Sequence, residues 1–432
     1  MKKIILSSVA LIALSTSLMA DETSELRELL KVLNERLTVL EAKNAKQVQQ
    51  TQTLTDELIN VQNQTSFNQV DMTQTKAGLG AAASKVYYSK NPLSIGGYGE
   101  LYYSKDTKLS NDNGGAKTES FRFIPYFGYK FSDSIILNTE VEFEHGGETV
   151  SIEQLYIDFL LDSSANIRVG NQLVPMGLIN QNHEPVMFNT VLRPDVATYL
   201  LPSTWHENGI SAYGNLGDFH YNAGMFVALD LNGVTVDKKW LRNGRRGGKG
   251  STKNTSNFAG VARLDYNGIN GLLLGGGMYV GRAGKPDVVG AKEGTIVMAD
   301  IHAQYQKDGF KAKGVYTQTT LSNASSYTVI NQMPKKAKGG YINLEYNVLP
   351  LFTNSSTRLP LFFQYENYNL ASSMSDGSSF GTSNSFTYGL NFFPHEQVVL
   401  KAEYSIRENK NDISSLNYTD ENLYSFGLGF IF

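Results

Sequence analysis

From Ser94 to the end of the chain, apolar and polar side chains alternate along short segments. The stretch from Ile135 to Glu144 alternates in this way, and the same period of two returns from Val398 to Arg407. Successive side chains point to opposite faces of a strand, so each such segment has one apolar and one polar face. We count about sixteen segments of this kind, which predicts an all-β region of about sixteen strands.

The connections between these segments alternate in length. Short turns, such as Ser132-Asp133 and Lys307 to Gly309, are followed by longer connections, such as Leu229 to Ser256 and Leu321 to Ala337. One connection at a long position, His145 to Thr149, is short. Antiparallel barrels in membranes have short turns at one end and longer loops at the other. The pattern therefore predicts an antiparallel transmembrane β-barrel.

The last strand is aromatic on one face and small or polar on the other. The aromatic face carries Tyr424, Phe426, Leu428, Phe430 and Phe432. A soluble β-sandwich would bury this face against a second layer, whereas a barrel in a membrane presents it to lipid. A strand of this kind also resembles the closing strand of bacterial outer-membrane barrels, which implies that it is the signal for barrel assembly.

A different period precedes the strands. The region begins with leucines spaced alternately four and three residues apart, the spacing of a coiled-coil seam. Three polar residues occupy the next seam positions, and the last seam positions are apolar again. The seam consists of Leu26, Leu30, Leu33, Leu37, Leu40, Asn44, Gln47, Thr51, Leu54, Leu58, Val61 and Met72. We predict a self-associating coiled coil; the alternative is one amphipathic helix folded back on its own chain. Leucine at both seam positions does not distinguish two strands from three.

The amino terminus has the features of an export signal. Lys2 and Lys3 precede an apolar run from Ile4 to Leu14, and Ala20 is followed by acidic residues. The run is shorter than the about 20 residues that span a bilayer. The chain contains no cysteine, which excludes disulfides, thiolate metal sites and a lipid-modified terminus. The predicted divisions are a signal peptide (1–20), a periplasmic coiled coil (21–76), a linker of small residues (77–93) and the barrel (94–432).

The longest connection, residues 174–207, has no strand pattern over roughly 34 residues, which indicates a functional loop. Val169 to Pro185 reads Val-Gly-Asn-Gln-Leu-Val-Pro-Met-Gly-Leu-Ile-Asn-Gln-Asn-His-Glu-Pro, and Pro202 to Glu207 reads Pro-Ser-Thr-Trp-His-Glu. These stretches, with the order of coiled coil and barrel, resemble the phosphate-selective porin family and its wider relatives. The resemblance implies a trimeric porin of sixteen strands whose third external loop folds into each lumen. The candidate constriction residues are Asn180, Asn182, His183, Glu184, Arg193 and Asp195.

Charged residues on the polar strand faces must line water, because an arginine or lysine facing lipid at the midplane costs about 2–4 kcal/mol. The predicted lumen charges are Arg122, Lys130, Glu140, Glu142, Arg168, Arg263, Lys311, Lys313, Lys401 and Glu403. Counted over the whole inner face, which adds Arg407, Glu100, Glu144, Asp158, Asp265, Asp300, Glu345 and Glu366, eight basic and ten acidic residues nearly balance in sign. We find no counterpart of the arginine ladder and lysine cluster of phosphate-selecting members. A basic cluster lies in the fourth external loop: Lys238, Lys239, Arg242, Arg245, Arg246, Lys249 and Lys253. It indicates either an anion funnel at the channel mouth or a solvated loop that binds lipopolysaccharide.

No enzyme, cofactor or metal site is predicted. His183-Glu184 and His206-Glu207 share one loop, but adjacent side chains point in different directions and the helical HExxH spacing is absent. No local Ser-His signature supports a barrel phospholipase. The net charge of −3 argues against a nucleic-acid partner.

The function predicted from these features is passive diffusion of small hydrophilic solutes or ions through a homotrimeric porin of the bacterial outer membrane. Preference for anions is left open. The expected partners are membrane lipid, lipopolysaccharide and the barrel-assembly machinery. The alternative is a structural tether, in which a plugged barrel is linked to the cell wall through the coiled coil.

Overall fold

The computed structural model describes residues 22–66, 78–109, 115–231, 234, 240–245, 257–284, 286, 289–327, 333–410 and 420–432. The predicted signal peptide, Met72 of the seam and five members of the basic cluster (Lys238, Lys239, Arg246, Lys249 and Lys253) lie outside the described residues. The chain divides into two compact units, Met1–Ser66 and Phe67–Phe432, and each is described by itself.

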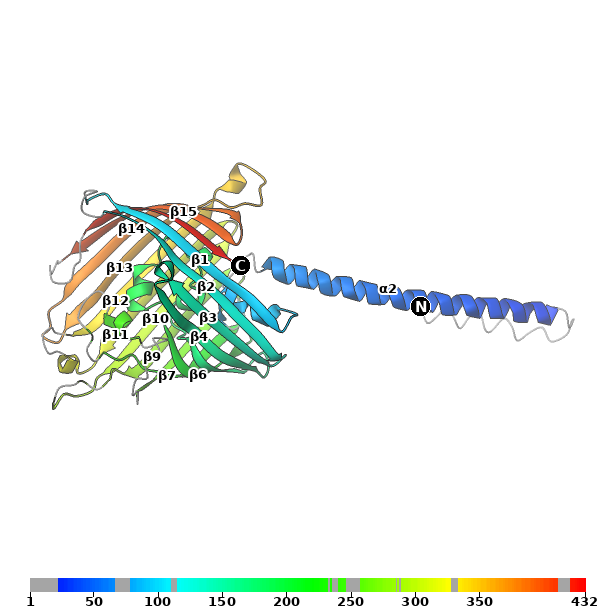
Figure 1. Cartoon of the computed structure of the whole chain (residues 1–432), viewed down its shortest axis with the longest axis horizontal. Helices are drawn as coiled ribbons and strands as arrows, with labels where there is room; N and C mark the ends of the chain where they lie inside the picture. Colours follow the sequence, from blue (N-terminus) through cyan, green and yellow to red (C-terminus); the bar gives the residue numbers. More distant parts are fainter. Residues whose placement is uncertain are drawn as a thin grey trace. The chain divides into compact units, whose positions relative to one another are not determined.

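The second unit is a closed barrel of sixteen antiparallel strands, which confirms the predicted fold and strand number. Figure 1 labels most of them along the barrel wall. The strands are β1 (Leu93–Asp106), β2 (Ala116–Ser132), β3 (Ile135–Glu144), β4 (Thr149–Leu160), β5 (Asn166–Leu173), β6 (His206–Leu216), β7 (Phe219–Val227), β8 (Phe258–Tyr266), β9 (Leu272–Arg282), β10 (Thr295–Lys307), β11 (Phe310–Leu321), β12 (Pro334–Asn347), β13 (Pro360–Met374), β14 (Phe380–His395), β15 (Val398–Lys410) and β16 (Glu421–Ile431).

The aromatic last strand closes the barrel. Strand β16 pairs with β15 on one side and with β1 on the other, with Tyr98 opposite Ile431. The terminal Phe432 exchanges backbone hydrogen bonds of 2.9 and 3.0 Å with Gly97. An edge strand would leave backbone N–H and C=O groups without hydrogen bonds, and closure of the barrel pairs them. This pairing is required in hydrocarbon, where no water can take their place.

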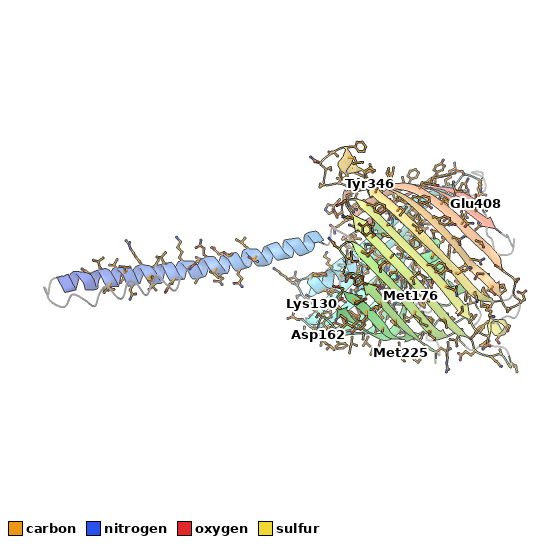
Figure 2. The ribbon with its side chains drawn as sticks, turned by 180° about the vertical axis from the view of Figure 1, so that it is seen from behind. Lys130, Asp162, Met176, Met225, Tyr346 and Glu408 are labelled. Carbon is orange, nitrogen blue, oxygen red and sulfur yellow. The ribbon has the colours of Figure 1, made fainter. Side chains whose placement is uncertain are left out.

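The two faces of the barrel wall have opposite chemistry. In β3 the inward Asn138, Glu140 and Glu142 are buried, whereas the outward Phe143 is exposed. Figure 2 draws these side chains over the whole barrel; of the residues that it labels, Met225 and Tyr346 are exposed and Met176 is buried. An apolar outer face over a polar inner face is the arrangement that a barrel in lipid needs.

The described residues of the first unit form one helix, α2 (Glu22–Ser66), of 45 residues. At a rise of about 1.5 Å per residue it is about 68 Å long. The leucines of the predicted seam whose side chains the structure describes are 52–61% exposed on this single chain: Leu30, Leu33, Leu37, Leu40 and Leu54. An uncovered leucine stripe favours association with another helix, and the coiled coil stays a prediction. None of the described helices is long and apolar enough to cross a bilayer.

The predicted linker contains a short helix, α3 (Ala81–Tyr88), inside the barrel. Its alanines and Val86 are buried, and it packs on β1, β2 and β3. The Nδ2 of Asn138, an inward residue of β3, donates to the carbonyl oxygen of Ala83 at 2.8 Å. A Cβ at Gly128 of β2 would overlap Val86, so this glycine lets the helix lie directly on the wall. Sequence alone did not indicate this helix, because a run of small residues is also typical of a linker.

Candidate functional site

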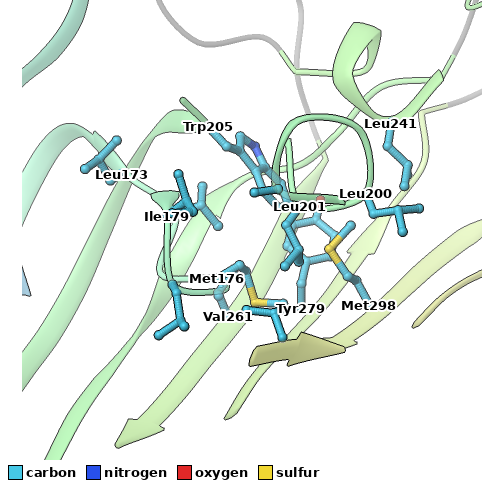
Figure 3. Packing of buried hydrophobic residues seen from close by; sticks show 14 of the residues in the cluster. Leu173, Met176, Ile179, Leu200, Leu201, Trp205, Leu241, Val261, Tyr279 and Met298 are labelled. Carbon is cyan, nitrogen blue, oxygen red and sulfur yellow. The ribbon is translucent and has the colours of Figure 1, made fainter. Parts of the chain in front are cut away.

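The third loop, from Val174 to Trp205 between β5 and β6, lies inside the barrel. It contains three short helical turns, η4 (Asn180–Asn182), η5 (Pro185–Met187) and η6 (Val196–Leu200). Strand β6 begins at His206, so the last two residues of the predicted loop belong to the wall. Figure 3 shows the loop packed on inward residues of the wall, where the Trp205 ring centroid lies 5.1 Å from that of Tyr279. This apolar packing fixes the position of the loop across the lumen.

Charged side chains of the wall hold the backbone of the loop. The Lys401 ammonium donates to the carbonyl oxygens of Phe188 and Thr190, both at 2.8 Å. The Lys313 ammonium donates to the carbonyl oxygen of Met187 at 2.5 Å. Two carboxylates of the wall accept hydrogen bonds from backbone amides of the loop: Glu403 from Val191 at 2.8 Å and Glu366 from Val196 at 3.0 Å.

These wall charges therefore satisfy backbone groups that a buried loop would otherwise leave unpaired. Each of the three predicted charges Lys313, Lys401 and Glu403 faces the interior, in contact with the loop. Glu366, the fourth anchor, is one of the ten acids expected to face the lumen, but its contact with the loop was not predicted. The signal for it is its place on the polar face of β13, where it follows Gln364 by two residues.

Two charges of the loop pair with the wall. The Nη2 of Arg193 donates to the Tyr98 hydroxyl at 3.2 Å and lies 3.8 Å from Oε1 of Glu100. The Oδ2 of Asp195 lies 2.6 Å from Nη2 of Arg407 and accepts from the Tyr368 hydroxyl at 3.0 Å. Both residues were predicted at the constriction, and the structure places Arg193 against β1 and Asp195 against β13 and β15.

The other four candidate constriction residues lie in and beside η4. Asn180 braces the loop internally, since its Nδ2 donates to the carbonyl oxygens of Val174 and Trp205 at 2.7 and 2.8 Å. The Nε2 of His183 lies 3.1 Å from Oε1 of Glu140 on β3. Asn182 lines a cavity of about 730 Å³ together with Gln181, Tyr87, His220 and Arg263.

Glu184 joins the third loop to α3. Its Oε1 accepts hydrogen bonds from the Ala82 and Ala83 amides, at 2.9 and 3.2 Å, in the first turn of the helix. A carboxylate at this place satisfies amides that have no partner within the helix. Burial raises the pKa of Glu184 to about 7. The Glu184 carboxyl group thus joins the loop to the helix inside the barrel.

The far end of α3 is fixed by a buried ion pair. The Arg168 guanidinium lies 2.8 and 2.9 Å from the two carboxylate oxygens of Asp158, and both residues are at most 1% exposed. Asp158 also accepts from the hydroxyls of Tyr87, in α3, and of Tyr213, in β6. Arg168 was predicted as a lumen charge, and in the structure it is buried with its counter-charge beneath α3.

The remaining five predicted lumen charges also lie on the interior side of the wall. Arg122 lies 2.6 Å from Glu144 and 3.3 Å from Glu100, and Glu142 accepts from the Ser151 hydroxyl at 2.8 Å. The Lys130 ammonium donates to the carbonyl oxygen of Ser89, after α3, at 2.6 Å. The remaining two face the interior from β8 and β11: Arg263 lies 2.8 Å from Asp265, and Lys311 is half-buried.

The fourth external loop turns two of its basic residues toward the third loop. Arg242 and Arg245 donate to the carbonyl oxygens of Ser203 and Thr204, the latter at 2.7 Å. The Trp240 indole, in α4 (Trp240–Asn243), donates to the carbonyl oxygen of Leu370 at 2.9 Å. Burial, together with the neighbouring Arg245, lowers the pKa of Arg242 to about 9. These two arginines therefore support the third loop, a role that neither the funnel nor the lipopolysaccharide interpretation predicted.

One residue of the interior contradicts strict alternation. Counting by twos along β4 from Asp158 places Gln154 inside and Glu153 outside, yet both side chains are buried inside the barrel. A β-bulge between Glu140 and Val141 of the paired β3 strand accounts for the shift. The signal in the sequence was an acid at an outward position of a strand, where lipid would make it costly.

Removing the carboxyl group of Glu184 should release α3 from the third loop. Loss of a helix cap costs about 0.5–2 kcal/mol, and we expect this loss of unfolding free energy for Glu184→Ala. Because the pKa is raised in the folded state, the protein should lose stability as the pH rises from about 4.5 to about 7. Urea unfolding at several pH values checks both effects. Glu184→Gln should remove this part of the pH dependence, and an unchanged pH profile in that variant would contradict the assignment.

Comparison with known proteins places the chain in a family. No family model matches it. A protein of Aquifex aeolicus (strain VF5), described as uncharacterized, is 32% identical over 358 residues, which cover 78% of this chain and 80% of that protein.

Solved structures share the fold at low sequence identity. The anion-selective porin from Comamonas acidovorans is 14% identical with a TM-score of 0.52, over 79% of this chain and 99% of the porin. The outer-membrane channel DcaP of Acinetobacter baumannii is 12% identical with a TM-score of 0.53, over 79% of this chain and 97% of the channel. The chain therefore has the barrel fold of outer-membrane porins and belongs to the same family as the Aquifex aeolicus protein.

Proposed function

We propose that the protein is an outer-membrane porin through which small hydrophilic solutes or ions diffuse passively. The observation that carries this proposal is the closed sixteen-stranded barrel, with an apolar outer face and charged residues along its inner face. A barrel of this strand number is wide enough for an aqueous channel, whereas an eight-stranded barrel is filled by its own side chains. Charges on the inner face have a physical reason only if that face borders water or polar groups.

The third loop and α3 set the size of solute that passes. Both lie inside the wall, and each is held there by hydrogen bonds and ion pairs with buried wall residues. The cavity of about 730 Å³ beside them is lined by amide, hydroxyl and charged groups together with three leucines, Leu160, Leu161 and Leu273. The polar groups of this mixed lining can hydrogen-bond to hydrated solutes.

Preference for anions is the finer part of the proposal. Lys313 and Lys401 bind carbonyl oxygens, which hold an ammonium group without neutralising its charge. Glu366 and Glu403 bind backbone amides in the same way and act with the opposite sign. Fixed charges near a constriction favour the counter-ion, but these two ammonium and two carboxylate groups balance in sign, so a preference for anions must come from other charges of the lumen or the loops.

The membrane and the assembly state follow from the same features. We propose insertion in the bacterial outer membrane by the barrel-assembly machinery, with Tyr424, Phe426, Leu428, Phe430 and Phe432 as the assembly signal and lipopolysaccharide around the outer face. We propose a homotrimer joined through periplasmic coiled coils of α2, whose exposed leucines support association. Membership of the phosphate-selective porin family stays a prediction, as does the absence of enzymatic activity.

Single-channel recording tests the proposal. The protein, folded into a planar bilayer, should give current steps of stable size, and a salt gradient across the bilayer should give a reversal potential whose sign identifies the preferred ion. Correctly folded protein that gives no current would contradict the porin function. It would favour the second candidate, a structural tether, which is supported by the occupation of the lumen by the third loop and α3.

Deletion of α2 separates association from conduction. A chain that lacks residues 22–66 should keep the size of the current step, because the wall, the third loop and α3 belong to the other unit. It should lose most of its trimer in chemical cross-linking. The coiled-coil prediction would be wrong if the shortened chain were as completely trimeric as the full chain.

A further inference from the structure

Three side chains with metal-binding groups meet where the third loop touches the wall. Glu140 comes from β3, Glu153 from β4 and His183 from the loop, and each is at most 2% exposed. Each offers one ligand atom, and these three atoms lie within 4.8 Å of one another. The Nε2 of His183 lies 3.1 Å from Oε1 of Glu140.

A β-bulge brings the second carboxylate into this group. Glu140 pairs with Gln154 and Val141 pairs with Ile152, so Glu153 is the extra residue without a partner on β3. The bulge turns Glu153 to the inner face beside Gln154, where regular pairing would turn it to the outer face. Bulges that redirect one side chain are frequent next to functional sites.

The imidazole of His183 presents a lone pair to the two carboxylates. Its Nδ1 lies 2.8 Å from the carbonyl oxygen of Asn180, and a carbonyl oxygen only accepts, so Nδ1 carries the proton. In the neutral ring Nε2 then has no proton and faces Oε1 of Glu140. A hydrogen bond from the other ring nitrogen to a carbonyl oxygen is typical of metal-bound histidines.

The carboxylates are held in place but not neutralised by protein cations. The Thr204 hydroxyl donates to Oε1 of Glu153, and the Gln154 amide donates to Oε2 of Glu140. Among the described residues, no donor reaches Oε2 of Glu153, and no lysine or arginine nitrogen lies within 4.0 Å of either carboxylate. Two buried carboxylates beside a lone pair require a positive charge between them.

We propose that Glu140, Glu153 and His183 bind one divalent transition-metal cation, of the class of zinc, and so fasten the third loop to the wall. One nitrogen and two carboxylate oxygens form a ligand set that zinc accepts, with a fourth position open to water. For bonds of about 2.0–2.1 Å, a tetrahedral site has ligands about 3.3 Å apart, close to the 3.1 Å observed between the imidazole and Glu140. This site does not depend on the proposed conduction, because it rests on the contact between loop and wall.

Zinc titration of the folded full-length protein tests the site. Protein stripped with a chelator, in detergent at pH 7.5, should bind one zinc ion tightly in isothermal titration calorimetry. Glu153→Gln and His183→Gln should each weaken binding at least about tenfold, since even the outer partners of a metal site cause losses of this size. His220→Gln is the matched control, because His220 also faces the interior but lies outside the cluster, and it should bind zinc as the native chain does. Heat-dependent migration in gels checks that each variant is folded.

A second probe covers the case in which a variant does not fold. Cobalt bound to the native chain should give the visible absorption of a four-coordinate site with nitrogen and oxygen ligands, and zinc should displace it. The proposal fails if native protein binds no zinc tightly, if both substitutions leave the affinity unchanged, or if cobalt gives only the spectrum of the hydrated ion. The first of these results would mean that a proton, shared between the carboxylates, supplies the charge.

Discussion

Replacing Asp158 by alanine is expected to destabilise the barrel by about 3–5 kcal/mol, because it leaves the buried guanidinium of Arg168 without its counter-charge. The two residues are at most 1% exposed, and Asp158 is also the acceptor for the hydroxyls of Tyr87 and Tyr213. Urea unfolding of protein folded into lipid vesicles measures the loss. The two tryptophans, Trp205 and Trp240, are both fully buried and report unfolding by fluorescence.

Two controls separate the ion pair from a general effect of lost charge. Asp133→Ala removes an acid from an exposed turn between β2 and β3 and should leave stability within about 0.5 kcal/mol of the native value. The double variant Asp158→Leu with Arg168→Met removes both charges and should be more stable than Asp158→Ala alone. If Asp158→Ala unfolded at the native urea concentration, the ion pair would not hold α3 in place.

Truncating Trp205 should loosen the third loop. Its indole is fully buried between the loop and Tyr279, and the change of a buried tryptophan to alanine costs about 3–5 kcal/mol. We expect Trp205→Ala to lower the unfolding free energy by this amount, with Trp240 as the remaining fluorescent probe. In planar bilayers the same variant should give noisier current, because a loop with a cavity beneath it exchanges between positions.

The matched control for this change is in the same loop. Leu192 is 42% exposed, so Leu192→Ala removes an apolar side chain of the loop without opening a cavity. It should change stability by less than about 1 kcal/mol and leave the current trace steady. Equal effects of the two substitutions would mean that the apolar packing shown in Figure 3 does not fix the loop.

The wall could be predicted from the sequence because its geometry repeats. Side chains alternate on a strand whatever its neighbours are, so Ile135 to Glu144 indicated two faces without knowledge of the rest of the chain. Connection length then indicated which end of the barrel each turn belongs to. The same rule failed at Glu153, because a bulge adds one residue and reverses the alternation beyond it.

The interior could be predicted only in part, because it has no period. The length of the third loop indicated that it was functional. The contacts of Lys401 and Glu403 with carbonyl and amide groups of the loop could not be predicted, because the partners are separated by 211 to 213 positions in the sequence. The helix α3 was missed for a related reason. Ala81, Ala82 and Ala83 form a helix that is stable against Gly128 and Asn138, and neither partner is near in sequence.

The anchors of the third loop have a consequence for the order of assembly. Glu366, Lys401 and Arg407 contact the loop from β13 and β15, more than 150 residues after it in the chain. The pairing of β16 with β1 closes the barrel beside these strands. We therefore expect the loop to act as an internal template when the final strands pair. A chain with a misplaced third loop would lose both the constriction and the contacts that support the strands next to the β16–β1 pairing from the inside.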